Sequence, residues 1–261
     1  MLAGPALPEP PPLPERREYP NPPIVEGLVQ FNFAQSIPWN VATPGRIFER
    51  LQDSYPADPE QQGVFQAGFG QTEGAQAAAD FTVTQAGTRV IYRDITRSKL
   101  IVINDKLLSI NSVQPYEGWE KLSQRITAAV AALSGVVELP LISDVSVRYI
   151  NTITVPAGSP TEKYVNYEIR TARSGSSYVN GFMQRVESVM PDGVTFAATT
   201  FASAAPPSPL EFPILLDIAF RRNLGDGQAI DQAIEVAHEL KVFENAEFES
   251  VITDEARKLF Q

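Results

Sequence analysis

One alternating apolar segment near the start of the chain constrains the fold most. Residues 19–23 form a proline-stiffened lead-in, and residues 24–33 read Ile-Val-Glu-Gly-Leu-Val-Gln-Phe-Asn-Phe. Apolar side chains that alternate with polar ones predict a β-strand with one buried face. Ile24 and Leu28 add apolar side chains to the second face, which we therefore expect to be partly covered. The buried face is expected to carry Val25, Val29, Phe31 and Phe33.

The rest of the chain divides into strand and helix patterns. Residues 56–79 are rich in Gly, Gln and Ala without clear periodicity, which predicts a loop or a loose hairpin. Turns are expected at Asn104-Asp105, at Pro191-Asp192-Gly193, and at the glycine pairs of 68–70 and 225–227. Period-two patterns predict strands at 81–84, 89–94, 100–104, 107–113, 145–155, 164–170, 179–190, 194–202 and 210–220. Helical spacing predicts helices at 44–55, 119–133, 230–243 and 253–260.

Strands that follow strands, with helices closing each run, predict an α+β fold with an antiparallel sheet. Two similar halves are expected, 19–138 and 139–261, each with a long strand, a meander and a helix. We expect one compact domain with its helices packed on one face of the sheet. Residues 1–18 are rich in proline and predict a flexible tail, although a ligand for an aromatic-lined groove is an open alternative.

Composition excludes several function classes. The chain has no cysteine, which rules out disulfides, cysteine-ligated zinc and thiol catalysis. Its formal net charge is −10, which makes nucleic acid or an anionic membrane an unfavourable partner. There is neither an apolar run of the ~20 residues that span a bilayer nor a secretory signal pattern, so the expected location is the cytoplasm.

Four short motifs, in order, give the chain a family resemblance. They are residues 20–28, Pro-Asn-Pro-Pro-Ile-Val-Glu-Gly-Leu; 148–151, Arg-Tyr-Ile-Asn; 214–218; and 248–254, Phe-Glu-Ser-Val-Ile-Thr-Asp. The chain resembles a sporadically distributed family of uncharacterised bacterial and archaeal proteins, which has Ala where Gly27 stands here. The resemblance spans 20–261 but leaves out 56–80. It implies a shared fold, and the sporadic distribution implies an accessory role, such as defence or toxin neutralisation.

Recognisable catalytic and cofactor motifs are absent from the sequence. The single histidine, His238, lies on the expected last helix and is interpreted as structural, with metal ligation beside Glu235 or Glu239 as the alternative. No Gly-x-Ser-x-Gly elbow and no phosphate-binding glycine loop occurs. We therefore predict no cofactor and no metal, and favour a protein that is not an enzyme.

Two charged clusters are candidate sites. Arg89, Arg93, Arg97 and Lys99 form a basic patch, which is either a solvated outer sheet face or a site for an anion or a partner. Tyr92 is expected to point the other way, so the patch lacks a stacking platform for nucleic acid.

Glu26, Arg148 and Asp217 form the second cluster. Each is expected on the polar side of a long strand, so the three share one sheet face if those strands are neighbours. They could form a buried ion-pair network, line a ligand cleft or partner surface, or support acid–base chemistry.

The leading hypothesis is a non-catalytic protein-binding protein, whose partner is another protein or a second copy of the chain. The alternative is a carboxylate-dependent hydrolase or a small-molecule-binding protein that uses Glu26, Arg148 and Asp217. A self-assembling structural protein with exposed strand edges is a third class.

Overall fold

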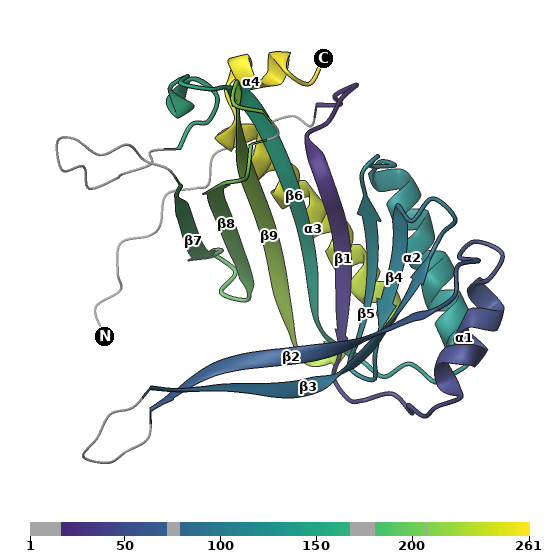
Figure 1. Ribbon diagram of the computed structural model, residues 1–261. Coiled ribbons are helices and arrows are strands. Elements are labelled where there is room, and N and C mark those ends of the chain that lie inside the picture. Colours follow the sequence, from purple (N-terminus) through teal and green to yellow (C-terminus); the bar gives the residue numbers. More distant parts are fainter. Residues whose placement is uncertain (1–16, 72–78, 168–180, 207) are drawn as a thin grey trace.

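The opening segment forms β1 (Ile24–Phe33), which lies in the interior of a nine-stranded antiparallel sheet (Figure 1). The computed structural model describes residues 17–71, 79–167, 181–206 and 208–261. The strand order is β2-β3-β4-β5-β1-β6-β9-β8-β7. The other strands are β2 (Glu60–Gln71), β3 (Ala79–Arg93), β4 (Lys99–Ile103), β5 (Leu107–Val113), β6 (Ile142–Pro156), β7 (Met183–Val189), β8 (Thr195–Ser203) and β9 (Glu211–Gln228).

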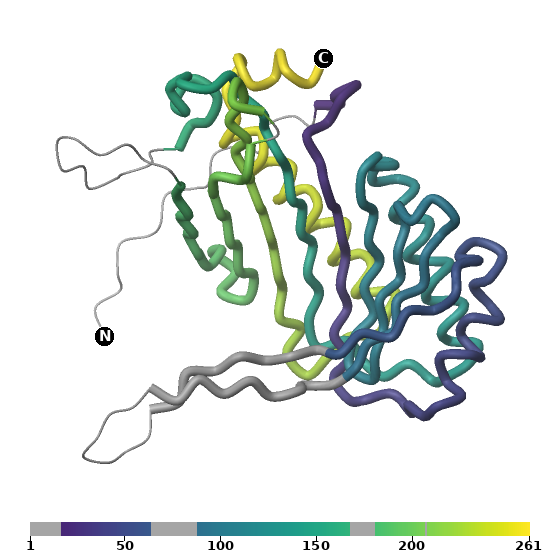
Figure 2. The backbone as a smooth tube through the Cα atoms, in the orientation of Figure 1, coloured from purple at the N-terminus to yellow at the C-terminus, as the bar shows by residue number. Residues whose placement is uncertain are grey.

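The helices pack against one face of this sheet. In Figure 1, α3 (Ile230–Val251) runs behind β6 and β9, while α1 (Thr43–Leu51) and α2 (Trp119–Ser134) lie towards the other end of the sheet. Two short helical segments, η1 (Thr161–Lys163) and α4 (Asp254–Lys258), follow β6 and α3. The smooth backbone trace shows the same arrangement (Figure 2). The α+β prediction is confirmed.

Alternate strand positions supply the core between the sheet and the helices. Val29 and Phe31 of β1 and Val147 of β6 have no exposed surface. They belong to one apolar cluster with Leu122 of α2 and Leu240 of α3. Each large apolar side chain buried in this way contributes roughly 1.5–3 kcal/mol relative to an exposed one. The period-two pattern of β1 therefore predicted the correct face for Val29 and Phe31. It was wrong for Val25, which is exposed and lies at a register irregularity between Ile24 and Glu26.

Gly27 shows how closely β1 and β6 pack. It lies opposite Tyr149 in the register of the two strands. A Cβ atom at position 27 would lie 2.6 Å from Cε1 of the buried Tyr149 ring. Glycine is therefore required here because the ring of the neighbouring strand occupies the space of a side chain.

Several local predictions were wrong. Of the two alternatives for residues 56–79, the loop is wrong for most of the segment and the hairpin is closer: residues 60–71 form strand β2, which pairs antiparallel with β3 along its whole length. Val64 is the only β-branched residue of β2, so the strand character of the segment comes mainly from this pairing and not from its own propensity. The glycine pairs of 68–70 and 225–227 also lie within strands; Gly225 (φ 61°) and Gly227 (φ 97°) sit near a register irregularity where β9 continues to Gln228.

The predicted strand at 164–170 is reduced, in its described part, to a bridge between Val165 and Ile252. Residues 168–170 lie outside the described residues, as does the proline-rich segment 1–16. The turn at 191–193 is present, with Gly193 at φ 71°.

Candidate functional site

The sheet face opposite the helices carries the polar cluster predicted from sequence. Glu26 lies on β1, Arg148 on β6 and Asp217 on β9, and these three strands are consecutive in the sheet. Glu26 and Asp217 both lie opposite Ile150 in the registers of their strands with β6. The structure therefore brings all three residues onto one face, which we call the open face.

Arg148 and Asp217 form a two-pronged ion pair. The Arg148 Nε atom donates to Asp217 Oδ1 at 2.8 Å, and Nη2 donates to Oδ2 at 2.6 Å. This fork geometry is the strongest form of a carboxylate pair. The hydrogen bonds from Arg148 to Asp217 raise the pKa of the guanidinium, and the nearby negative charge of Glu26 adds to this effect.

Glu26 belongs to a neighbouring chain of hydrogen bonds. Asn111 on β5 donates from Nδ2 to Glu26 Oε1 at 2.7 Å, and Ser109 donates to Asn111 Oδ1 at 2.8 Å. Asn111 and Ser109 are buried, whereas Glu26 is half-buried. Glu26 therefore acts on Arg148 through its charge while its own described hydrogen bond goes to Asn111.

A second arginine repeats the arrangement further along the open face. Arg221 Nε donates to Asp144 Oδ1 at 2.9 Å, and Asn32 Nδ2 donates to the same oxygen at 2.6 Å. The side chain of Arg221 is 59% exposed and that of Asp144 is 8% exposed. The Arg148 and Asp217 side chains are 45% and 10% exposed. In both pairs a buried carboxylate holds an arginine whose outer part faces solvent.

Two arginines of the predicted basic patch pair with Glu60, which lies at the start of β2. Arg93 Nε donates to Glu60 Oε2 at 3.2 Å, and Arg97 contacts the other oxygen of Glu60. The hydrogen bonds from Arg93, and then those from Arg97, lower the pKa of Glu60. Arg89 donates to Gln62, and Lys99 lies 3.5 Å from Glu117. All four basic groups thus have polar or acidic neighbours, which fits a solvated sheet face.

His238 takes part in packing. Its ring lies edge-on to Trp119 with centroids 5.3 Å apart, and Nε2 is 3.3 Å from Ser123 Oγ. The adjacent Glu239 pairs with Arg222. Among the described residues, no group of three or more His, Cys, Asp or Glu side chains could hold a metal ion.

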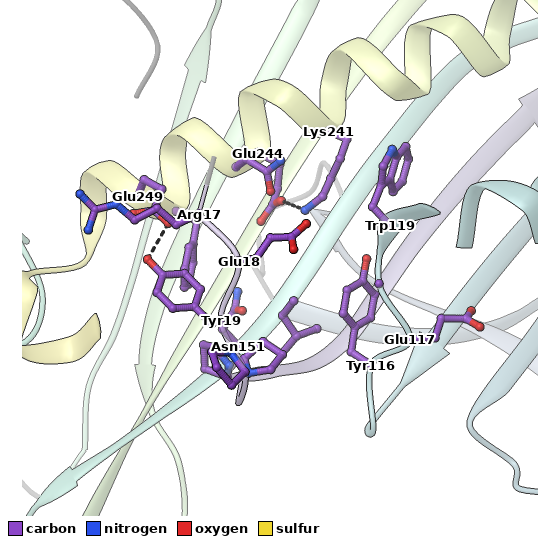
Figure 3. Close-up of a pocket in the computed structure, with 17 residues that line it drawn as sticks. Arg17, Glu18, Tyr19, Tyr116, Glu117, Trp119, Asn151, Lys241, Glu244 and Glu249 are labelled. Carbon is purple, nitrogen blue, oxygen red and sulfur yellow. Dashed lines mark hydrogen bonds and ion pairs between the residues drawn. The ribbon is translucent and has the colours of Figure 1, made fainter. Parts of the chain in front are cut away.

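Sequence reasoning missed a pocket of about 330 Å³ between α3, the residues leading into β1, and the loop before α2 (Figure 3). Lys241 and Glu244 of α3 point into it from one side, and Tyr116 faces them from another. Glu18 reaches towards Lys241 from the N-terminal segment. Its walls also include Tyr19, Trp119, Asn151, Phe248 and Glu249.

Lys241 and Glu244 form a buried ion pair in this pocket. The Lys241 ammonium lies 3.5 Å from the centroid of the Tyr149 ring, within cation–π range. Burial raises the pKa of Glu244, and the charge of Lys241 opposes this rise. A Lys and a Glu three residues apart on a helix usually form an exposed ion pair, so the sequence gives no sign that this pair is special. Its burial distinguishes it, and burial is visible only in the structure.

Three of the four motif regions meet at this pocket. Pro20, Pro22, Pro23 and Ile24 come from the first motif, Asn151 from the second, and Phe248 and Glu249 from the last. The backbone N–H of Thr152 donates to Pro23 O at 2.9 Å, which ties the first motif to β6.

Comparisons with known proteins give no family assignment. No family model matches the chain, and a search of curated proteins found no match. Among the described residues, no helix is both long enough and apolar enough to cross a membrane.

Proposed function

We propose that this chain is a non-catalytic binding protein that recognises an acidic segment of a partner protein through the open face of its sheet. The observation that carries the proposal is the pair of half-exposed arginines, Arg148 and Arg221, held over buried carboxylates. Both arginines lie on inner strands of the sheet, β6 and β9, and their outward N–H groups are donors on the open face.

Arginine in this setting is well suited to protein recognition. Its planar guanidinium binds carboxylates in a fork, and arginine is enriched among the residues that dominate binding energy at interfaces. Asp217 and Asp144 already fix the two arginine side chains, so less rotamer freedom is lost when a partner binds.

Charge selects the class of partner. The chain as a whole carries −10, so a general attraction for polyanions is not expected. The local display of arginine on the open face nevertheless provides donors for individual carboxylates. A protein segment with a few Asp or Glu side chains fits this combination better than a nucleic acid does.

The hydrogen bonds of the cluster argue against the hydrolase alternative. Both oxygens of Asp217 accept hydrogen bonds from Arg148, and Glu26 accepts one from Asn111. A general acid and base need two carboxylates with contrasting environments and access to substrate. The pocket beside Lys241 is a more suitable place for a small molecule than the Glu26, Arg148 and Asp217 cluster, and its volume favours this second candidate function.

We also infer that the two halves of the chain share one plan. In 19–138 the first strand, β1, lies beside the last strand of a meander, β5, and α2 follows. In 139–261, β6 lies beside the last strand of its meander, β9, and α3 follows. The two first strands pair with each other, and this would place the arginine pairs near the junction of the halves. A defence or toxin-neutralising role rests on the family resemblance alone.

The test is affinity capture with the full chain, tagged, in lysate of its native host. The wild-type chain is expected to retain a specific protein, and Arg148→Ala is expected to lose it. Arg46→Ala is the matched control, because Arg46 is exposed on α1 at the opposite side of the sheet. Failure of the wild-type chain to retain any protein above background would contradict the proposal, as would equal retention by Arg148→Ala.

A further inference from the structure

Strand β7 is the outermost strand at one end of the sheet, and no described strand pairs with its outer side (Figure 1). Its sequence, residues 183–189, is Met-Gln-Arg-Val-Glu-Ser-Val. All of these residues except the half-buried Gln184 are exposed, on both faces of the sheet. An exposed edge of this kind is a template for another strand.

The hydrogen bonds to β8 show which amide groups face outward. Met190 N donates to Thr195 O at 2.8 Å, and Ser203 N donates to Phe182 O at 3.0 Å. In an antiparallel pair, alternate residues direct both backbone groups to the same neighbour. The even-numbered residues therefore bond to β8, and the odd-numbered ones direct their N–H and C=O groups to the outer side.

We propose that the outer edge of β7 binds β7 of a second copy of this chain, antiparallel, with Val186 opposite Val186 of the partner copy. This register places Arg185 opposite Glu187 and Met183 opposite Val189, each twice by symmetry. All four pairs join residues with outward amide groups, so each residue donates and accepts a backbone hydrogen bond. Such a self-complementary contact is the isologous type found in two-fold dimers.

Neighbouring registers are disfavoured by charge. A shift of the partner by two residues in one direction places Arg185 opposite Arg185, and a shift in the other direction places Glu187 opposite Glu187. Like charges directly opposite each other destabilise a strand pair. A shift by one residue would place each odd-numbered residue opposite an even-numbered one, whose backbone groups already bond to β8, so the backbone hydrogen bonds could not form. The central register is thus selected by both charge and backbone pairing.

Apolar surface supports the same pairing. Met183 is 78% exposed and Val189 is 57% exposed, and the proposed register brings them together on the open face. Phe196 of β8, which lies beside Val189 in the sheet, is also exposed. Covering these side chains would supply part of the association free energy.

The dimer would affect partner binding. The symmetry axis of an antiparallel strand pair in register runs through the sheet, so both open faces point to the same side. Two copies of the arginine pairs would then be available to a partner with repeated acidic segments, which increases avidity. Dimerisation through β7 is nevertheless independent of whether the open face binds a protein.

The first test uses the absence of cysteine from the chain. Val186→Cys places one thiol on the symmetry axis, where opposing residues of a non-hydrogen-bonded pair have Cα atoms about 4.5 Å apart, within disulfide range. Mild oxidation of purified full-length protein should give a covalent dimer. Ser188→Cys is the control, because Ser188 would lie opposite Gln184 and far from its own copy. Equal cross-linking of both variants, or none with Val186→Cys, would overturn the proposal.

The second test is sedimentation over a range of micromolar concentrations with charge variants. The wild-type chain and the exchange variant Arg185→Glu/Glu187→Arg should dimerise equally, whereas Glu187→Arg alone should weaken dimerisation at least tenfold. A wild-type monomer throughout, or an unchanged dimer in Glu187→Arg, would contradict it. Arg148→Ala should dimerise like the wild-type chain, because Arg148 is not part of β7. Loss of dimerisation therefore tests this proposal, and loss of partner capture tests the proposed function.

Discussion

Tyr19 donates a hydrogen bond to Glu249 at 2.7 Å, although 230 residues separate them in the sequence. The Tyr19 ring also lies edge-on to Phe260, with centroids 5.4 Å apart, and Asn21 N donates to Phe260 O. Arg257 contacts the same Glu249 carboxylate. The lead-in to β1 is therefore fastened to the end of the chain, and this contact forms one wall of the pocket.

Tyr19→Phe should lower the free energy of unfolding by about 1–2 kcal/mol, because a hydrogen bond to a charged acceptor is lost. Chemical denaturation at pH 7 measures the change. The pH dependence identifies the cause. Burial, and then the hydrogen bond to Glu249, raises the pKa of Tyr19 from 10.0 to about 12.

A raised folded-state pKa means that the neutral phenol stabilises the fold fully below pH 10, and that this contribution is lost as pH rises towards 12. The stability difference between the wild-type chain and Tyr19→Phe should therefore shrink between pH 10 and 12. A stability difference between the two proteins that stays constant from pH 10 to 12 would contradict a stabilising contact between the neutral Tyr19 phenol and Glu249.

Removing one charge of the buried Lys241–Glu244 pair should destabilise the fold more than removing both charges. Glu244→Gln removes one charge of this buried ion pair and should cost about 3–5 kcal/mol. The double variant Lys241→Met/Glu244→Leu removes both charges and should recover most of that loss. Thermal and chemical unfolding measure both. A double variant as unstable as the single one would show that the pair is held by more than its mutual attraction.

Gly27→Ala should be destabilising by about 1–3 kcal/mol, since its Cβ would overlap the Tyr149 ring. Gly45→Ala provides the control, because no atom lies within 4 Å of a Cβ built at that position of α1. The control should be neutral or stabilising by up to about 1 kcal/mol, given the higher helix propensity of alanine. If the two variants had equal stability, close packing of β1 on β6 would not explain the glycine.

Glu26→Ala should cost about 1–2 kcal/mol, chiefly because the buried Asn111 side chain loses its acceptor. This cost is below that of a broken, fully buried ion pair, since Glu26 is half-buried and Arg148 keeps Asp217. Denaturation of Glu26→Ala and Glu26→Gln separates the two effects, because glutamine retains an oxygen for Asn111 without the charge. A loss above about 3 kcal/mol in the glutamine variant would contradict this explanation.

Strands and helices with strong periodicity could be predicted from the sequence. The alternation in β1 and the helical spacing of Leu122 and Ile126 in α2 reflect burial on one face, which local patterns record directly. Strand β2 could not be predicted in this way, because pairing with β3 and not side-chain type makes it a strand.

The open face could be anticipated from parity, because Glu26, Arg148 and Asp217 interrupt apolar strands. The matching of the two arginines with buried carboxylates depends on strand order and register, which the sequence does not state. The pocket depends on contacts between the two ends of the chain, as between Tyr19 and Glu249, and no local pattern predicts these.

The most direct test of the central claim measures stability and partner capture on the same protein, Arg148→Ala. Removal of Arg148 leaves the buried Asp217 carboxylate without its two donors, so the free energy of unfolding should fall by about 1–3 kcal/mol. Capture of the partner should fall at least tenfold under conditions in which the variant is still folded. Arg46→Ala should change neither quantity. A variant that loses stability but captures the partner at wild-type level would contradict the account and make Arg148 a structural residue.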